Sequence, residues 1–560
     1  MEREQKKKKL YVILRTLPVA VALVAIWFCF HFGSVFRSNP NIIWNDGWDV
    51  EINGELFEQV NLHEFSFPAV NRGDVVTLTK TMPEENLYAP MLMIRAYHTA
   101  IHVMVGNDEV FSHGEKELQA GEMVGYGFFW ITIPNDYVGK ELEIEYKIAE
   151  PAAFSSLEPV YIQNGDQMLQ NFVWENAVEL LIVGFLLIVG IFCIVLYCIS
   201  GKRGLAYRMI LSIAALALLA AAWISSSTGI LQFVEQNYYL NNVIEYSSLY
   251  CLPIFVLLFA RDLLEEKKHQ RYIMCDLILH MIYLVVVETA NWFNLFHLQR
   301  LLLVYHLLTL CSFALIITLI IRESKGEQLS SRKTFLLGTF ITIVICGMDI
   351  LRFNIEKYIY HSTTTKVSIV PVAALCIVLT MGISYFQRLM YSYHQNVEKD
   401  TLMKIAYTDA LTQINNRAKC EEVLTKLDEF GKKAAIVYMD LNYFKQINDS
   451  YGHAMGDEAL KDFALILSQT MGKHGFVGRM AGDEFIAVFT EEAAEHIQSF
   501  IRELYDALEQ FNRKKERCYE LHAACGLAAR KEADEIKGWD LCKRADADMY
   551  EKKKSLKVAR

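Results

Sequence analysis

The sequence predicts a multidomain membrane protein with three structural parts: an all-β sandwich, a bundle of membrane-spanning α-helices and a C-terminal α+β domain. Short alternating strands with turn residues fill residues 37–172. Apolar runs of about 20 residues, the length that crosses a bilayer, recur over residues 173–387. Helical and extended patterns alternate over residues 406–560.

The overall composition excludes several classes of protein. A net charge of −10 gives no basic footprint for nucleic acid, so we expect no nucleic-acid partner. None of the twelve cysteines lies in residues 37–172, and the sequence contains no Cys-x-x-Cys zinc pattern. A disulfide framework is therefore not expected.

Residues 1–36 begin with a basic segment, Lys6 to Lys9, and continue into an apolar run over 16–36. This arrangement fits either a cleaved signal peptide or a retained membrane anchor. We favour the anchor, because the apolar run is long and lacks a clear small-x-small cleavage site.

Residues 37–172 carry short runs of alternating character, punctuated by turn signals such as Asn53-Gly54. The runs lie at 75–79, 91–94, 101–105, 130–133 and 142–146. Regular short strands of this kind predict a β-sandwich. The domain resembles the jelly-roll sensor domains of some bacterial receptors.

Several aromatic and imidazole side chains of this domain have two possible roles. They line a pocket for an unidentified small-molecule or protein ligand, or they belong to the core and to strand pairs. These residues are Trp44, Trp48, Tyr97, His98 and Trp130.

Residues 173–387 contain seven apolar stretches of membrane-spanning length. The loops after the first, third and fifth stretches carry most of the cations, so the positive-inside rule places these loops in the cytoplasm. With the anchor, eight spans cross a bacterial plasma membrane, both termini are cytoplasmic, and residues 37–172 lie outside. The stretches lie near 177–199, 208–228, 240–260, 273–291, 300–321, 334–352 and 367–387.

Acidic residues also fall in or near these stretches. A charge at membrane depth is costly and often functional, but a small shift in a span boundary moves it to the interface. A ligand or proton role and an interfacial position therefore both remain open for Glu179, Glu245, Asp276, Glu288 and Asp349.

Residues 388–405 are expected to form a helix that links the membrane region to the C-terminal domain. Phe386, Met390, Tyr393 and Val397 follow a heptad-like spacing. The pattern fits a parallel helix pair and a plain connector helix equally well.

The C-terminal domain, residues 406–560, is predicted to hold a sheet rich in antiparallel strands. We expect strands at 433–441 and near 518–528, and a hairpin over 476–489. Helices are expected over 416–430, around Leu460 to Leu467, over 497–511 and from about 538 to 554.

Acidic residues mark two of these strands. Asp440 closes the apolar run 434–441, and Asp483 and Glu484 follow a predicted Ala481-Gly482 turn in the hairpin. Three carboxylates drawn from two segments would form a hard oxygen-ligand site suited to Mg²⁺.

These residues resemble the GGDEF family of diguanylate cyclases. The matching text is Asp409-Ala-Leu-Thr412, Asn416-Arg417, Asp440, Phe444-Lys-Gln-Ile-Asn-Asp449, Gly452-His453, Gly456-Asp457 and Ala481-Gly-Asp-Glu-Phe485. The resemblance implies a ferredoxin-like palm that converts two GTP molecules into cyclic di-GMP. The alternative is a catalytically weak domain that binds GTP and regulates a partner. The order of sandwich, seven spans and output domain is similar to that of bacterial seven-span receptors.

The resemblance also implies a role for individual residues. Mg²⁺, with Mn²⁺ as an alternative, is held by Asp440, the Leu441 carbonyl and Asp483. Asp483 is the general base, Glu484 assists it, and Lys445 stabilises phosphate charge. Because each site holds one GTP, turnover requires a homodimer. The expected substrate-binding residues are Asn448, His453, Asp457, Lys553 and Lys557.

The sequence departs from the family pattern at a few positions. Ala481 replaces the first glycine of the signature, and Leu556-Lys557-Val558 replaces the usual C-terminal phosphate motif. The Arg-x-x-Asp product-inhibition motif is absent, because its positions are Gly472 and Gly475. We therefore expect an active enzyme without feedback inhibition at that place.

Overall fold

The computed structural model describes residues 42–62, 64–65, 70–85, 87–150, 157, 160–199, 205–323, 329–358, 369–430, 433–531 and 534–558. Within the predicted anchor it describes Ala20, Val21, Leu23, Val24 and Trp27, so the anchor lies largely outside the described residues. The chain divides into two compact units, Met1–Tyr391 and Ser392–Arg560.

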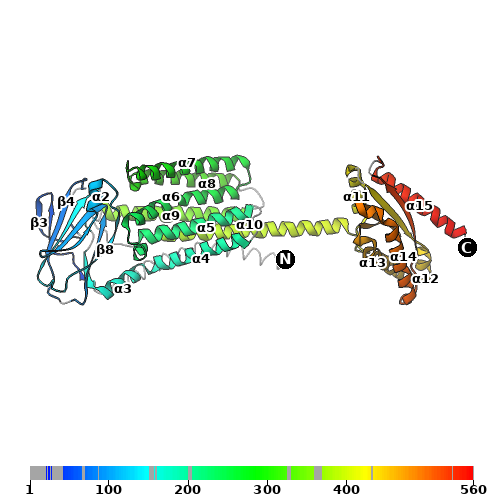
Figure 1. The fold of residues 1–560 in the computed structure, drawn as a ribbon, viewed down its shortest axis with the longest axis horizontal. Coiled ribbons are helices and arrows are strands. Elements are labelled where there is room, and N and C mark those ends of the chain that lie inside the picture. The colour runs from blue at the N-terminus through cyan, green and yellow to red at the C-terminus, as the bar shows by residue number, and fades with distance from the viewer. Residues whose placement is uncertain are drawn as a thin grey trace. The chain divides into compact units, whose positions relative to one another are not determined.

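The first unit begins with two antiparallel sheets (Figure 1). One sheet has the strand order β1-β10-β5-β8, and the other has the order β3-β2-β4-β9-β6-β7. The strands are β1 (Ile42–Ile43), β2 (Trp48–Ile52), β3 (Glu55–Val60), β4 (Val75–Thr81), β5 (Pro90–Tyr97), β6 (Thr99–Val105), β7 (Asp108–His113), β8 (Tyr126–Thr132), β9 (Glu141–Ile148) and β10 (Tyr161–Asn164).

The two sheets share one hydrophobic core. Alternate residues of β4, such as Leu78, and of β9, such as Ile144, belong to the same buried cluster as Leu92 and Ile94 of β5. Because successive side chains of a strand point to opposite faces, this alternation gives each sheet one apolar face to bury. The predicted β-sandwich is therefore present, and its role as a sensor stays a prediction.

The helical bundle follows the sandwich. Seven of its helices, among the described residues, are long and apolar enough to cross a membrane, which agrees with the predicted count. The helices are α2 (Glu115–Ala120, within the sandwich), α3 (Gly165–Glu175), α4 (Ala177–Ile199), α5 (Leu205–Ser227), η2 (Ile230–Phe233), α6 (Tyr238–Leu263), α7 (Lys267–Trp292), η3 (Leu298–Leu301), α8 (Leu302–Arg322), α9 (Leu329–Tyr358) and α10 (Val370–Tyr407).

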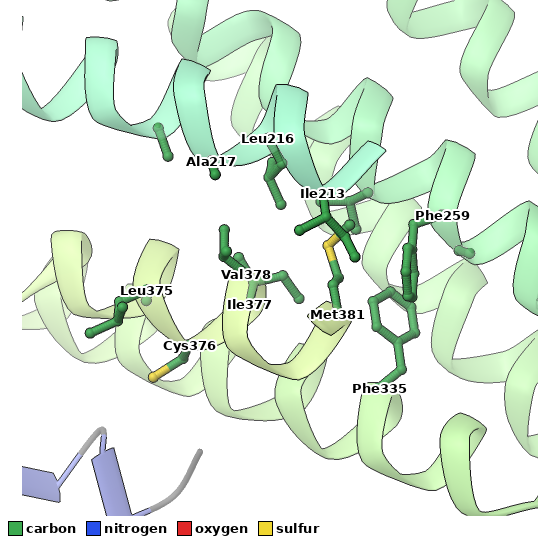
Figure 2. Close-up of a cluster of buried hydrophobic side chains, with 14 of the residues drawn as sticks. Ile213, Leu216, Ala217, Phe259, Phe335, Leu375, Cys376, Ile377, Val378 and Met381 are labelled. Carbon is green, nitrogen blue, oxygen red and sulfur yellow. The ribbon is translucent and has the colours of Figure 1, made fainter. Parts of the chain in front are cut away.

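The bundle core is built around the last helix. Figure 2 shows Val378 and Met381 of α10 beside Leu216 and Ile213 of α5. Phe259 of α6 and Phe335 of α9 face each other in the same cluster, with ring centroids 5.1 Å apart. Helix α10 is therefore packed on several other spans rather than on one neighbour.

The sandwich docks on one end of the bundle through polar contacts. Asn242 of α6 donates to the Tyr126 carbonyl (3.1 Å), and Asn294, just after α7, donates to the Gly121 carbonyl (2.7 Å). The Tyr126 hydroxyl donates to Glu245. This end carries the α5–α6 and α7–α8 connections, whereas α10 leaves the bundle at the other end (Figure 1).

Among the residues considered for a ligand pocket, the three tryptophans divide between two places. Trp44 and Trp48 form an edge-to-face pair in the sandwich core. Trp130 instead packs against Phe172 and Phe233, at the junction of the sandwich and the bundle. The structure thus does not gather them around one pocket, and the core interpretation accounts for the tryptophan pair.

Three of the five acids near the spans have protein partners, whereas Asp276 Oδ2 is buried without a hydrogen-bond partner. Glu245 accepts a hydrogen bond from Tyr126 of the sandwich, which places it at the docked end of the bundle. Glu288 accepts one from Ser247 (2.5 Å), and Asp349 pairs with Arg352 at 3.1 Å. These partners favour structural roles at span ends, and a ligand or proton role stays a prediction.

The second unit holds a four-stranded antiparallel sheet of order β12-β13-β11-β14 (Figure 1). The element order β-α-β-β-α-β is ferredoxin-like. The strands are β11 (Ala434–Leu441), β12 (Phe476–Ala481), β13 (Glu484–Thr490) and β14 (Ala523–Arg530). The helices are α11 (Arg417–Phe430), α12 (Phe444–Tyr451), α13 (His453–Gln469), η4 (Met471–Lys473), η5 (Glu491–Glu495), α14 (Ile497–Lys514) and α15 (Gly538–Val558).

The central strand β11 is buried on both faces. Ala435, Val437 and Met439 face the side covered by α13 and α14, while Ile436 and Tyr438 face the side covered by α11 and α15. A strand between two helical layers needs apolar residues at every position, which explains the continuous apolar run in the sequence.

The structure corrects the predicted positions of one turn and one strand in this domain. The hairpin turn consists of Gly482 and Asp483 rather than Ala481-Gly482, because Ala481 still pairs with Glu484 as the last residue of β12. Gly482 has φ = +38°, a backbone conformation that glycine adopts at little cost, and alanine resists it. The strand expected near 518–528 begins later, at Ala523.

Candidate active site

The acidic residues of the two motifs meet at one end of the sheet. Asp440 of β11 and Glu484 of β13 are directly opposite one another in the antiparallel ladder. The Leu441 amide donates to the Asp483 carbonyl (3.1 Å), which ties the hairpin turn to the end of β11. Cross-strand partners project from the same face of a sheet, so strand register alone brings these carboxylates together.

Arg479 of β12 holds the hairpin turn in place. Its Nε and Nη2 donate to the Gly482 carbonyl at 2.9 and 2.6 Å, and its Nη1 pairs with Asp409 at 3.1 Å. Asp409 also accepts from the Thr412 amide (2.9 Å) and hydroxyl (2.7 Å). Sequence reasoning missed Arg479, although a lone cation in an otherwise apolar strand was a usable signal.

The two aspartates of the site have different electrostatic surroundings. Burial and the nearby Asp440 carboxylate raise the pKa of Asp483 above its usual range. Lys553 of α15 donates to the Asp440 carboxylate at 2.5 Å. Adjacent carboxylates that repel each other and attract an ammonium group suit a divalent cation.

The protein donors alone do not complete a metal site. Among the described residues, no three His, Cys, Asp or Glu side chains are grouped so as to hold a metal ion. Asp440, Asp483 and the Leu441 carbonyl fit Mg²⁺ as a partial set, because Mg²⁺ is usually bound by one or two carboxylates together with substrate phosphates and water.

Glu484 is oriented by a neighbouring tyrosine. The Tyr438 hydroxyl donates to the Glu484 carboxylate at 3.0 Å. Burial and the charge of Glu484 raise the pKa of Tyr438, so this phenol keeps its proton and remains a donor. The carboxylate therefore has one fixed partner and a defined direction.

The predicted substrate-binding residues of α12 and α13 form a second group. Lys445, His453 and Asp457 are exposed, and Asn448 is half-buried. A Cβ on Gly456 would lie 2.0 Å from the Asn448 Oδ1, so the absence of a side chain at Gly456 leaves room for the amide at this place. Within the described chain no ion pair joins Lys445 to the carboxylates.

The C-terminal helix and the product-inhibition positions also bear on the site. Lys553 lies on Asp440, as stated, whereas the side chain of Lys557 falls outside the described residues. A Cβ on Gly475 would lie 2.5 Å from the Val488 carbonyl oxygen. An aspartate at position 475 would therefore require the backbone to move.

Family models match both major parts of the chain. One described as "Diguanylate cyclase, GGDEF domain" covers residues 406–557, and one described as "7TM diverse intracellular signalling" covers residues 175–388. The C-terminal domain is thus a GGDEF domain carried by a seven-helix membrane receptor region.

Individual relatives agree with this class. A diguanylate cyclase of Vibrio cholerae is 29% identical over 164 residues, which are 28% of this chain and 50% of that protein. The probable diguanylate cyclase DgcF of Escherichia coli K12 is 27% identical over 208 residues, 31% of this chain and 66% of that protein. An uncharacterised 19.3 kDa protein of Streptomyces ambofaciens is 33% identical over 145 residues and is covered to 77%.

A solved structure is similar to the same region. The GGDEF domain of DgcB from Caulobacter crescentus, in complex with c-di-GMP, is 26% identical, with a TM-score of 0.24. The match covers 27% of this chain and 91% of that one. The chain spans about half the length of the Vibrio relative. It belongs to the GGDEF family of diguanylate cyclases, in the form of a multi-pass membrane receptor.

Proposed function

We propose that the protein is a membrane-bound diguanylate cyclase that condenses two GTP molecules into cyclic di-GMP and two pyrophosphates. The observation that carries this proposal is the register of β11 against β13, which sets Asp440 opposite Glu484 with Asp483 in the adjoining turn. A pure binding module has little use for such a set of repelling carboxylates.

The reaction joins the 3′-hydroxyl of one GTP to the α-phosphate of another, twice. Asp483 accepts the hydroxyl proton, and Glu484, held by Tyr438, keeps a second negative charge near the same place. Asp440, Asp483 and the Leu441 carbonyl would hold a divalent cation, which would supply positive charge to the triphosphate and the α-phosphate. GGDEF diguanylate cyclases are metal-dependent, and we propose Mg²⁺ or Mn²⁺ here.

Base selection rests on α12 and α13. A carboxylate at Asp457 accepts from the N1–H and amino groups of guanine, a donor pair that adenine lacks, and the Asn448 amide lies beside Gly456. Lys445 and Lys553 supply positive charge for the phosphates, and His453 lies at the start of α13. Since each domain binds one GTP, two copies of the chain must meet for turnover.

The membrane receptor region would control this encounter. Within the first unit, the sandwich docks on one end of the bundle and α10 leaves at the other end. With the cationic loops in the cytoplasm, the sandwich is extracellular and the cyclase is cytoplasmic. Binding of a ligand to the sandwich would then change cyclase activity.

The test uses the full-length protein in lipid nanodiscs with GTP and Mg²⁺, and it measures both cyclic di-GMP formation and GTP binding. We expect turnover in the wild type and a loss of about 100-fold or more in Asp483→Ala with GTP binding retained. Glu503→Ala, which changes a carboxylate on α14, is a matched control. Wild-type protein that binds GTP without turnover would support the rival role as a regulatory binding module.

A further inference from the structure

The end of the bundle from which α10 leaves contains a buried cluster of charged side chains that the catalytic proposal does not use. Asp262 on α6 and Arg332 on α9 are each 2% exposed, and Glu323 at the end of α8 is 6% exposed. Buried charges are tolerated where each has partners, and they become costly as soon as one partner is lost. Such a cluster therefore favours one arrangement of its helices strongly.

Glu323 binds the connection between α6 and α7. Its carboxylate accepts from the amides of Glu265 (2.9 Å) and Glu266 (3.1 Å), and it lies 2.8 Å from the Nδ1 of His269. Arg332 Nη2 approaches the same carboxylate to 3.3 Å. One acidic side chain thus connects the end of α8 to α7 and α9.

Arg332 extends the cluster to α6. Its Nη1 donates to the Glu323 carbonyl (2.9 Å), its Nε to the Leu263 carbonyl (3.4 Å), and its Nη2 lies 2.8 Å from the Glu265 carboxylate. Asp262, which precedes Leu263 in α6, forms an ion pair with Arg261 at 2.7 Å. The guanidinium therefore holds three helix ends in one layer.

Helix α10 is fastened to this layer at two successive turns. The Ser384 hydroxyl donates to the Ser331 carbonyl (3.0 Å), and the Thr334 hydroxyl donates to the Gln387 side chain (3.0 Å). Arg388 donates to the Asp262 carbonyl. These contacts involve α9 and α6 next to the charged cluster, where α10 leaves the bundle.

These fastenings specify the register of α10 more sharply than its apolar packing does. Closer to its N-terminus, α10 contacts other helices through apolar side chains such as Val378 and Met381, as Figure 2 shows. Apolar surfaces remain favourable after a small slide or rotation, whereas directional hydrogen bonds to fixed carbonyls are broken by it. A displaced α10 would leave Arg388 and Gln387 without these partners.

We propose that Glu323, Arg332 and Asp262 fix the ends of α6, α8 and α9 as one latch, to which α10 is hydrogen-bonded in one register. Release of this latch is the step by which the spans switch the C-terminal domain. The output part of this inference rests on the proposed cyclase function. Signals from the sandwich end reach the latch through α6, which contacts the sandwich through Asn242 and carries Asp262 at its other end. The latch thus lies between α6, which contacts the sandwich, and α10, which leads to the C-terminal domain, so a change at either end of the receptor would bias it.

The experiment compares full-length wild type with Arg332→Gln in lipid nanodiscs, using amide hydrogen exchange of α10 and the rate of cyclic di-GMP formation. We expect exchange over residues 384–407 to rise by about tenfold, with the sandwich strands unchanged. Turnover should change by about threefold or more, in line with the size of coupling effects. Lys333→Gln, at the exposed neighbouring cation, should change neither quantity.

Second variants keep the test decisive. Arg388→Gln removes the link to α10 without unpairing a buried carboxylate, so it replaces Arg332→Gln if that variant fails to fold. Arg332→Lys should restore part of the protection. Unchanged exchange in a folded Arg388→Gln protein overturns the latch, and altered exchange with unchanged turnover overturns its role as a switch. If the wild type shows no turnover, the proposed cyclase function is refuted instead of the latch. A difference in amide exchange over residues 392–407 between wild type and variant then decides whether the latch acts on α10 beyond the bundle.

Discussion

Replacing Gly456 with alanine should weaken GTP binding without unfolding the domain. Gly456 lies in α13, where alanine is intrinsically favoured over glycine by about 0.5–1 kcal/mol. The new Cβ would nevertheless lie 2.0 Å from Asn448 Oδ1 and 2.9 Å from its Cγ. Contacts below about 3 Å cannot persist, so the Asn448 amide must move by roughly 1 Å or more.

The magnitude follows from the hydrogen bonds that the displaced amide would lose. A neutral hydrogen bond contributes about 0.5–1.5 kcal/mol, which corresponds to a rise in KM for GTP of roughly 2–12-fold. Because Asn448 is half-buried and can rotate outward, we expect the apparent Tm to stay within about 3 °C of the wild type. The effect should therefore appear in KM rather than in folding.

The assay is steady-state cyclic di-GMP formation by the full-length protein over a range of GTP concentrations. Gly472→Ala is the matched control in the same domain, because the nearest atom to its Cβ would lie 3.4 Å away, an ordinary contact. An unchanged KM in a folded Gly456→Ala protein would refute the assignment of Asn448 to guanine.

Three other predictions concern stability and the hairpin. Burial lowers the pKa of His98 to about 4, so folding opposes its protonation, and stability falls as pH drops from about 6.5 to 4. The expected loss in the free energy of unfolding is about 3 kcal/mol, measured by denaturant unfolding of the sandwich at different pH values. The same pH dependence in His98→Gln as in the wild type would contradict this assignment. Arg479→Lys removes the two-nitrogen grip on the Gly482 carbonyl, and kcat should fall by about tenfold; an unaltered kcat would argue against this positioning role. Gly475→Asp should lower the free energy of unfolding by about 1–3 kcal/mol, because its Cβ would lie 2.5 Å from a backbone oxygen of β13; thermal unfolding at the wild-type Tm would be inconsistent with that close approach.

Local pattern was sufficient for much of the architecture. The seven apolar runs became seven helices of membrane-spanning length, and the alternating runs of residues 75–79 and 101–105 became strands β4 and β6. These features depend on periodicity and length, which are properties of neighbouring residues in the chain. The same holds for the carboxylates at the end of β11 and in the hairpin, which motif spacing was able to single out.

The exact position of the hairpin turn could not be obtained in this way. Ala481-Gly482 and Gly482-Asp483 are both plausible two-residue turns by composition. Pairing of Ala481 with Glu484, together with the grip of Arg479 on the Gly482 carbonyl, selects the second. The choice depends on contacts with a neighbouring strand and with Asp409, about 70 residues away in the chain.

The sequence by itself determined the seven apolar stretches of membrane-spanning length, the kinds of domain and the positions of the acidic motifs, because these are written in local periodicity and in short segments. Only the tertiary structure decided that Lys553 pairs with Asp440, that Gly456 leaves room for the Asn448 side chain, and that Arg332 joins the ends of α6 and α8. Each of these contacts joins segments whose separation is set by helix packing and strand register. Such distances depend on the whole fold and not on any single stretch of residues.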